Sequence, residues 1–124
     1  MKNRIFNWRF SGNEKKYLND ILKTGLKPKK RKTYNSILEK KWSKYHKLKY
    51  SITVNSCTSA LHVAFLSIDC KVGDEVLVPD LTWVASVAPI KYVGAKPIFV
   101  DIQKDTLCID PLKIQKKITK RTKA

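Results

Sequence analysis

The chain has 124 residues, 43% of them hydrophobic, and a formal net charge of +16. This length suits one compact domain, and no apolar run approaches the ~18–20 residues that a membrane helix needs. The first ten residues lack the apolar core of a secretory signal, so we expect a cytoplasmic protein. Three cysteines without a close pair and two histidines without HExxH spacing argue against a disulfide framework and a zinc site.

The positive charge is concentrated at the two ends of the chain. Residues 1–50 carry 16 basic and 3 acidic side chains, residues 51–110 carry 4 and 7, and residues 111–124 carry 6 and none. Such a basic protein often binds nucleic acid through its phosphates, and this alternative stays open. Only four of the 26 basic residues are arginine, the side chain that phosphate and base recognition favours, which counts against it.

Two helices are predicted in the first fifty residues. Apolar residues recur at helical spacing in Ser11–Lys23, with Ser11 as N-cap and Gly25 at the C-cap, and again in Tyr34–Lys47. Between them lies the most cationic run, Leu26–Lys32, which we interpret as a solvated loop or as a contact to nucleic acid or a phosphorylated substrate. Ten residues between the two helices are too many for the short turn of a DNA-binding helix-turn-helix.

A strand that leads through a polar turn into a helix is predicted next. Ser51–Val54 is β-branched, Asn55–Ser59 is the turn, and Thr58–Ile68 is a helix that is apolar nearly all round, so we expect it to be buried against the sheet. The first amides of a helix have no partner within the helix and can hold a phosphate. Ser56 and the two hydroxyl residues after Cys57 would add donors, although serine and threonine are also ordinary N-caps.

Two further strands and two helices complete the predicted pattern. A strand at Glu75–Val78 ends at Pro79 and is followed by a turn that carries Trp83. The next helix, Trp83–Tyr92, should be kinked at Pro89 or confined to the turns before it. A third strand, Pro97–Asp101, precedes a helix that begins with Asp110 as N-cap and Pro111 at its first position. This alternation predicts an α/β fold with a parallel core and a ligand at the carboxyl ends of the strands.

Five sequence motifs occur in the order NSCTSALH, GDEVLVPDLTWVAS, YVGAKPIFVDI, IDP and ITKRTKA. Together they resemble, over roughly Phe10 to Ala124, the N-terminal third of the DegT/DnrJ/EryC1/StrS family. These are pyridoxal 5′-phosphate (PLP) dependent aminotransferases that act on nucleotide-linked keto-sugars. The resemblance implies a partial large domain of the aspartate-aminotransferase-like (fold type I) fold, with a basic helical segment at residues 1–50 and the start of the PLP-binding domain at 51–124.

The resemblance also assigns roles to individual residues. Thr58 and Ser59 match the positions that hold the cofactor phosphate, and Trp83 matches the aromatic residue that stacks on the pyridine ring. Asn55, Ser56 and Cys57 border the phosphate site, where the family usually has glycine at the position of Cys57. His62, one turn inside the helix, has no catalytic counterpart in the family.

The resemblance further implies a nucleotide-sugar substrate, glutamate as amino donor, and a homodimer or a complementary fragment as partner. None of the 22 lysines matches the family's Schiff-base lysine, which would follow Ala124, so we expect no catalytic residue and no transaminase activity in this chain alone. An inactive folded partner that regulates a full-length homologue is a further alternative. A sheet cut after three strands would expose an edge and an apolar face, so we also expect association.

Overall fold

The computed structural model describes residues 12–24 and 33–124. It divides into two compact units, Met1–Thr53 and Val54–Ala124, and each is described by itself. The predicted caps Ser11 and Gly25 and the cationic run Leu26–Lys32 lie outside the described residues. Within the described residues, no helix is both long and apolar enough to span a membrane.

The first unit contains the two predicted helices, α1 (Glu14–Thr24) and α2 (Tyr34–His46). The α2 helix is capped at both ends. The Thr33 hydroxyl accepts a hydrogen bond from the Ser36 amide at 3.1 Å, and Lys47 adopts the left-handed conformation (φ 56°) that ends the helix. Tyr34, at the start of α2, donates its hydroxyl to Asp20 of α1 at 2.6 Å, which raises the pKa of the tyrosine.

The predicted strand at Ser51–Val54 is wrong. Among the described residues no strand lies beside this segment, and side chains of α2 bind it instead. The amide and the hydroxyl of Thr53 both donate to the Glu39 carboxylate at 2.8 Å, and the hydroxyls of Ser51 and Ser43 lie 2.7 Å apart. Hydrogen bonds from the Thr53 amide, and then from its hydroxyl, lower the pKa of Glu39. A β-branched run becomes a strand only when another strand pairs with it.

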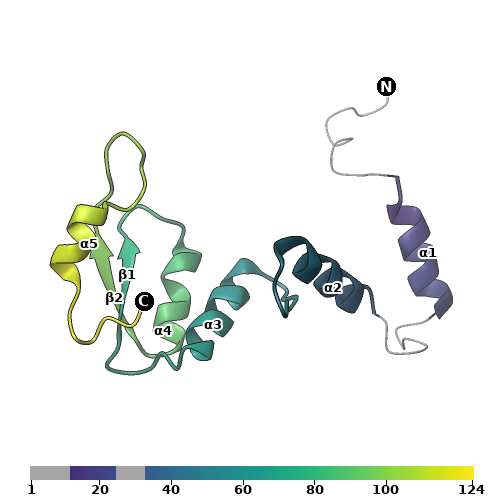
Figure 1. Cartoon of the computed structure of the whole chain (residues 1–124), viewed down its shortest axis with the longest axis horizontal. Coiled ribbons are helices and arrows are strands. Elements are labelled where there is room, and N and C mark those ends of the chain that lie inside the picture. The colour runs from purple at the N-terminus through teal and green to yellow at the C-terminus, as the bar shows by residue number, and fades with distance from the viewer. Residues whose placement is uncertain (1–11, 25–32) are drawn as a thin grey trace. The chain divides into compact units, whose positions relative to one another are not determined.

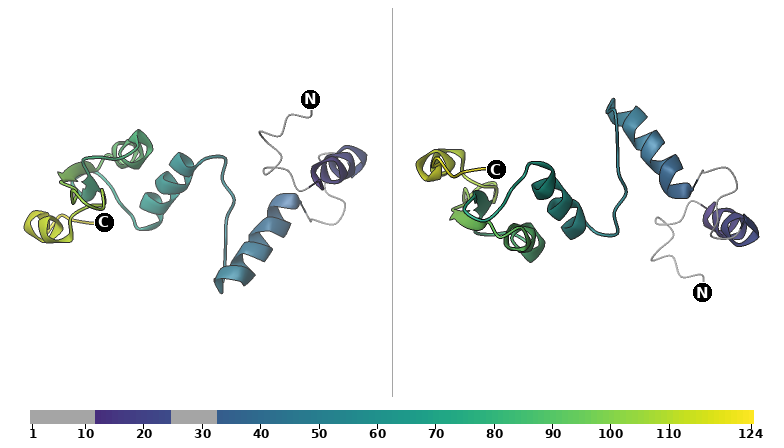
Figure 2. Two further views of the ribbon diagram at one scale, coloured as in Figure 1. Left: turned by 90° about the horizontal axis from the view of Figure 1, so that it is seen from above. Right: turned by 90° about the horizontal axis from the view of Figure 1, so that it is seen from below.

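The second unit is built on a two-stranded parallel sheet, which confirms the predicted α/β class. Strand β1 (Glu75–Pro79) pairs with β2 (Lys96–Val100), so that Glu75 lies opposite Lys96 and Pro79 opposite Val100. Around the sheet are the helices, listed in chain order: α3 (Cys57–Ser67), the 3₁₀ turn η2 (Val84–Ser86), α4 (Ala88–Tyr92) and α5 (Pro111–Lys117). The sheet lies between α4 and α5 (Figures 1 and 2).

The core of this unit lies where β1 meets α4. Ile90 of α4 is fully buried and packs with Val76 and Val78, which alternate along β1 and therefore share one face of the sheet. Cys70 and Ala95 complete the buried cluster, and burial raises the pKa of the Cys70 thiol. Cys70 precedes β1 and Ala95 precedes β2, so this small apolar core anchors the chain segment that leads into each strand.

Two expectations about the helices of this unit are corrected. The α3 helix has no buried residue, because among the described residues only η2 and α4 contact it substantially, and Val63 and Leu66 stay exposed. The helix expected from Trp83 to Tyr92 is divided into η2 and α4, and Pro89 lies in the first turn of α4 instead of ending a helix. Proline is tolerated there because the first amides of a helix have no acceptor within it.

Candidate cofactor site

The start of α3 is ordered by its own polar side chains. Ser56 is the N-cap: its hydroxyl accepts a hydrogen bond from the Ser59 amide at 3.1 Å, and its carbonyl accepts one from the Ala60 amide at 3.0 Å. The Ser59 hydroxyl in turn donates to the side-chain oxygen of Asn55 at 2.7 Å. The side chains of Asn55, Ser56 and Ser59 therefore hydrogen-bond to one another within the turn, without a ligand.

This capping leaves two backbone donors without an acceptor. Among the described residues none accepts a hydrogen bond from the amides of Cys57 and Thr58 or from the Thr58 hydroxyl. The amides lie at the positive end of the helix dipole, an environment that favours an anion. Ser59 differs from Thr58, because both its amide and its hydroxyl already have partners within the turn.

Trp83 lies beyond the carboxyl end of β1, after the turn formed by residues 80–82. The residue is 78% exposed, and within the described part of the chain the indole makes no ring contact or hydrogen bond. Its carbonyl accepts from the Ser86 amide at 2.9 Å, which starts η2, and the hydroxyls of Thr82 and Ser86 lie 3.0 Å apart. Among the described residues, no hydrogen bond or ring contact therefore fixes the position of the indole.

The start of α3 and Trp83 belong to elements that contact each other. The η2 turn that begins directly after Trp83 contacts α3. In Figure 1, α3 descends towards the loop that leads into β1, which then rises again, so the start of α3 and the end of β1 lie on the same side of the unit. No hydrogen bond joins Trp83 to Cys57, Thr58 or Ser59 among the described residues, and Cys57 is a free, exposed thiol.

The groups present fit part of what PLP requires. Two amides and a hydroxyl at a helix start suit a phosphate, and an exposed indole offers a flat, polarisable face for an aromatic ring. The described residues contain no cluster of side chains that could bind a metal ion. His62 is half-buried and meets Tyr92 edge-on, with ring centroids 5.5 Å apart, so its surroundings are those of a packing residue.

A separate hollow of about 210 Å³ lies in the first unit, between α2 and the extended segment after it. Its lining is mainly apolar and consists of Leu38, Glu39, Trp42, Ser51, Ile52 and Thr53. It contains none of the residues that the sequence assigns to the cofactor. Trp42 of α2 is about half exposed there and lies against His46, with ring centroids 4.5 Å apart.

Sequence reasoning missed the role of Glu75, which it treated only as the start of a strand. Its carboxylate is buried and binds the Thr119 hydroxyl at 2.6 Å and the Arg121 guanidinium at 2.8 Å. These partners lie more than forty positions along the chain, so no local spacing could have indicated them. The available signal was an acidic residue at the start of an otherwise apolar strand.

Comparison with known proteins extends these observations. The model of the DegT/DnrJ/EryC1/StrS aminotransferase family matches residues 10–124. The GDP-perosamine synthase of Escherichia coli O157:H7 is 40% identical over 120 residues, which are 97% of this chain and 33% of the relative. The chain therefore spans about a third of the length of that relative.

Solved structures of aminotransferases contain the same fold. One described as a sugar aminotransferase from Streptococcus pneumoniae in its PLP form matches with a TM-score of 0.80 and 34% identity, covering 91% of this chain and 28% of that one. NtdA from Bacillus subtilis with bound cofactor PMP matches with a TM-score of 0.79 and 34% identity, covering 86% and 24%. The parallel sheet thus matches part of a fold type I PLP aminotransferase, and the chain belongs to the DegT/DnrJ/EryC1/StrS aminotransferase family.

Proposed function

We propose that this chain forms the phosphate-holding and ring-stacking part of a PLP-dependent aminotransferase that acts on a nucleotide-linked keto-sugar. The observation that carries the proposal is the start of α3, where the amides of Cys57 and Thr58 are left without an acceptor by the Ser56 cap in a chain of this family. The 40% identity to a GDP-perosamine synthase supports a nucleotide sugar as substrate. The family match favours this function over nucleic-acid binding.

Each residue of the site has a defined task in this proposal. The phosphate accepts hydrogen bonds from the amides of Cys57 and Thr58 and from the Thr58 hydroxyl. The Ser59 hydroxyl can donate to the phosphate only if it gives up its hydrogen bond to Asn55 or its contact with the Ser56 hydroxyl. Trp83 covers one face of the pyridine ring and fixes its orientation. When bound, PLP supplies the electron sink that allows an amino group to pass between an amino acid and a keto-sugar.

The same proposal covers the donor, the assembly and the compartment. Glutamate as amino donor and a homodimer are extended to this chain from the family resemblance. The exposed free thiols of Cys57 and Cys108 favour a reducing compartment such as the cytoplasm. We further propose that residues 1–124 by themselves do not turn over substrate, because no lysine among them matches the family's Schiff-base position.

Nuclear magnetic resonance of the ¹⁵N-labelled chain tests the site directly. Inorganic phosphate should shift the amide signals of Cys57 and Thr58 and leave the Trp83 indole unchanged, whereas PLP should shift all three. The Trp42 indole lies in the other unit and serves as internal control. Thr58→Val keeps the amide and removes the hydroxyl, so we expect several-fold weaker PLP binding. PLP shifts that avoid both α3 and Trp83 would refute the site.

A chimera tests the substrate class. Residues 1–124 replace the matching third of the E. coli GDP-perosamine synthase, and the formation of GDP-perosamine is measured together with the absorbance of bound PLP. We expect the chimera to bind PLP and to lose most of its activity on Trp83→Ala, whereas Trp42→Ala should retain it. A chimera that folds, binds PLP and is unaffected by Trp83→Ala would remove Trp83 from the proposal.

A further inference from the structure

One face of α3 carries its half-buried side chains. They recur three or four positions apart, the spacing that places residues on the same side of a helix. They are Thr58, Ser59, Leu61, His62 and Phe65. Among the described residues only η2 and α4 contact α3 substantially, so this face is the one that meets them. Thr58, which is proposed to bind the cofactor phosphate, therefore lies on the face of α3 that packs on these two elements.

A pair of rings joins this face to α4. The His62 imidazole, one turn after Thr58, meets the Tyr92 ring edge-on, with ring centroids 5.5 Å apart and an angle of 69° between the ring planes. Edge-to-face contact is one of the arrangements that aromatic pairs prefer, and it is directional. Phe65, about one turn further along α3, packs against the buried cluster that contains Ile90 of α4. Two successive turns of α3 are thus held against α4.

The other half of the proposed site, Trp83, is tied to α4 through the backbone. The Ser86 amide donates to the Trp83 carbonyl at 2.9 Å, and the Val87 amide donates to the Val84 carbonyl at 3.0 Å. The Ile90 amide of α4 then donates to the Val87 carbonyl at 3.1 Å, and the Ile90 side chain is fully buried. A shift of α4 relative to α3 would therefore carry the backbone of Trp83 with it.

We infer that His62 is a positioning residue for the proposed cofactor site, because its contact with Tyr92 sets the separation between the start of α3 and Trp83. This role rests on the proposed function, since it concerns how Thr58 and Trp83 act on one ligand. A ligand that binds only at the start of α3 does not depend on that separation. A ligand that also stacks on Trp83 does depend on it, although His62 touches neither its phosphate nor its ring.

Two ligands distinguish these cases on the full chain. Nuclear magnetic resonance titrations give the affinity for inorganic phosphate and for pyridoxamine 5′-phosphate (PMP), which has the ring and phosphate of PLP without the aldehyde that reacts with lysines. His62→Ala should weaken PMP binding by roughly two- to tenfold and leave phosphate binding unchanged. Equal losses for the two ligands, or an unchanged PMP affinity, overturn the inference.

Further substitutions separate positioning from general stability. His62→Phe keeps a ring at this position and should retain most of the PMP affinity. Tyr92→Leu alters a residue that is 62% exposed, so it provides the test even where His62→Ala does not fold, and it should cause the same selective loss. The double variant should bind PMP no more weakly than either single variant, because the two residues act through one contact. Losses that add in full would contradict the inference.

A second histidine–tyrosine pair supplies the matched control. His46 meets Tyr45 edge-on with ring centroids 4.9 Å apart, and this pair belongs to the other compact unit. His46→Ala and Tyr45→Leu should leave the affinities for phosphate and for PMP unchanged. A loss of PMP affinity in these variants as large as in His62→Ala would show that the effect is not specific to the contact between α3 and α4.

A spin label tests the positioning without any cofactor. One of the three cysteines is buried, so a Cys108→Ser chain is labelled at Cys57 alone. Paramagnetic broadening of the Trp83 indole signal then reports its separation from the start of α3. We expect His62→Ala to change this broadening and His46→Ala to leave it unchanged, and equal broadening in all three chains overturns the inference. If His62→Ala changes the broadening but PMP never shifts the Trp83 signal, the proposed function alone is refuted.

Discussion

The hydroxyl of Ser56 caps the start of α3. It satisfies the Ser59 amide and so leaves the amides of Cys57 and Thr58 as the donors for an anion. The same hydroxyl contributes to stability, because a capped helix end loses fewer backbone hydrogen bonds to solvent. The cofactor role proposed for this turn and its structural role therefore depend on the same residue.

We predict that Ser56→Ala lowers the free energy of unfolding by about 1 kcal/mol, the usual cost of losing an N-cap. Urea unfolding followed by circular dichroism measures the change. Ser67→Ala, at the other end of α3, is the matched control: its hydroxyl only contacts the Ala64 carbonyl and should contribute little. Equal effects of the two substitutions would mean that the cap has no special role.

The ionised carboxylate of Glu75 makes the stability of the folded protein fall at acid pH. The hydrogen bond from Thr119, and then the charge of Arg121, hold the pKa of Glu75 below its ordinary value, although burial acts in the opposite direction. A lowered folded-state pKa stabilises the protein above the unfolded-state pKa, about 4.3 for glutamate, and this stabilisation is lost as the pH falls through the folded-state value.

We therefore predict that unfolding becomes easier below about pH 4.3 and that Glu75→Gln weakens this dependence. Thermal unfolding from pH 7 to pH 3 measures it. Asp69 also has a lowered pKa, caused by Lys71, but this ion pair is exposed, so Asp69→Asn should change the profile little. An unchanged profile in Glu75→Gln would show that the contacts of Glu75 with Thr119 and Arg121 are not formed in solution.

At the scale of elements, Gly94 joins α4 to β2. It has a φ of +77°, and its amide donates to the Lys91 carbonyl, which ends the helix. A Cβ atom at this position would lie 2.6 Å from a methyl group of Val72. Both the left-handed backbone and the close approach of Val72 therefore favour glycine.

We predict that Gly94→Ala costs more stability than Gly73→Ala. Gly73 also has a positive φ, +96°, but a methyl group added there would meet no atom within 4 Å, so its substitution should cost only the backbone strain of about 1–2 kcal/mol. The difference between the two, measured by urea unfolding, gives the cost of moving Val72. Equal losses would mean that Val72 rotates away freely.

At the scale of the whole molecule, many large apolar side chains are exposed in the second unit. They include Leu66 of α3, Trp83, and Leu112 of α5. Large apolar side chains exposed in this number favour association or aggregation. This is the physical basis for expecting association of the isolated chain.

We predict that the isolated chain self-associates as its concentration rises, and that Leu66→Glu reduces this several-fold by placing a charge on the open side of α3. Sedimentation velocity over a range of concentrations measures it. Leu107→Glu is the matched control, since it alters an exposed leucine on the loop between β2 and α5. A chain that stays monomeric throughout would contradict the prediction.

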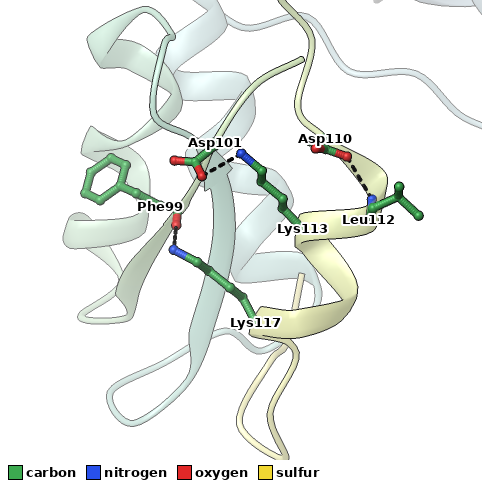
Figure 3. Close-up of polar contacts among 6 residues, drawn as sticks. All are labelled: Phe99, Asp101, Asp110, Leu112, Lys113 and Lys117. Carbon is green, nitrogen blue, oxygen red and sulfur yellow. Dashed lines mark hydrogen bonds and ion pairs between the residues drawn. The ribbon is translucent and has the colours of Figure 1, made fainter. Parts of the chain in front are cut away.

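The elements that could be predicted are those whose signals are local. Helical spacing predicts α2 and α3, and the Asp-Pro pair predicts Asp110 as the N-cap of α5, where its carboxylate accepts a hydrogen bond from the Leu112 amide at 3.0 Å (Figure 3). The errors are of another kind. The β-branched run 51–54 favours a strand in the sequence, although strand pairing depends on a distant segment, and Pro89 is compatible with either a kink or a helix start.

By itself the sequence determined the α/β class, the parallel strands β1 and β2, and the family, because these depend on periodicity and on motifs read in order along the chain. Only the tertiary structure decided that Glu75 binds Thr119 and Arg121, that the Lys117 ammonium binds the backbone of β2, and that α3 keeps one side open. The reason is that such contacts join residues far apart in the chain, and their partners have no signature in local spacing.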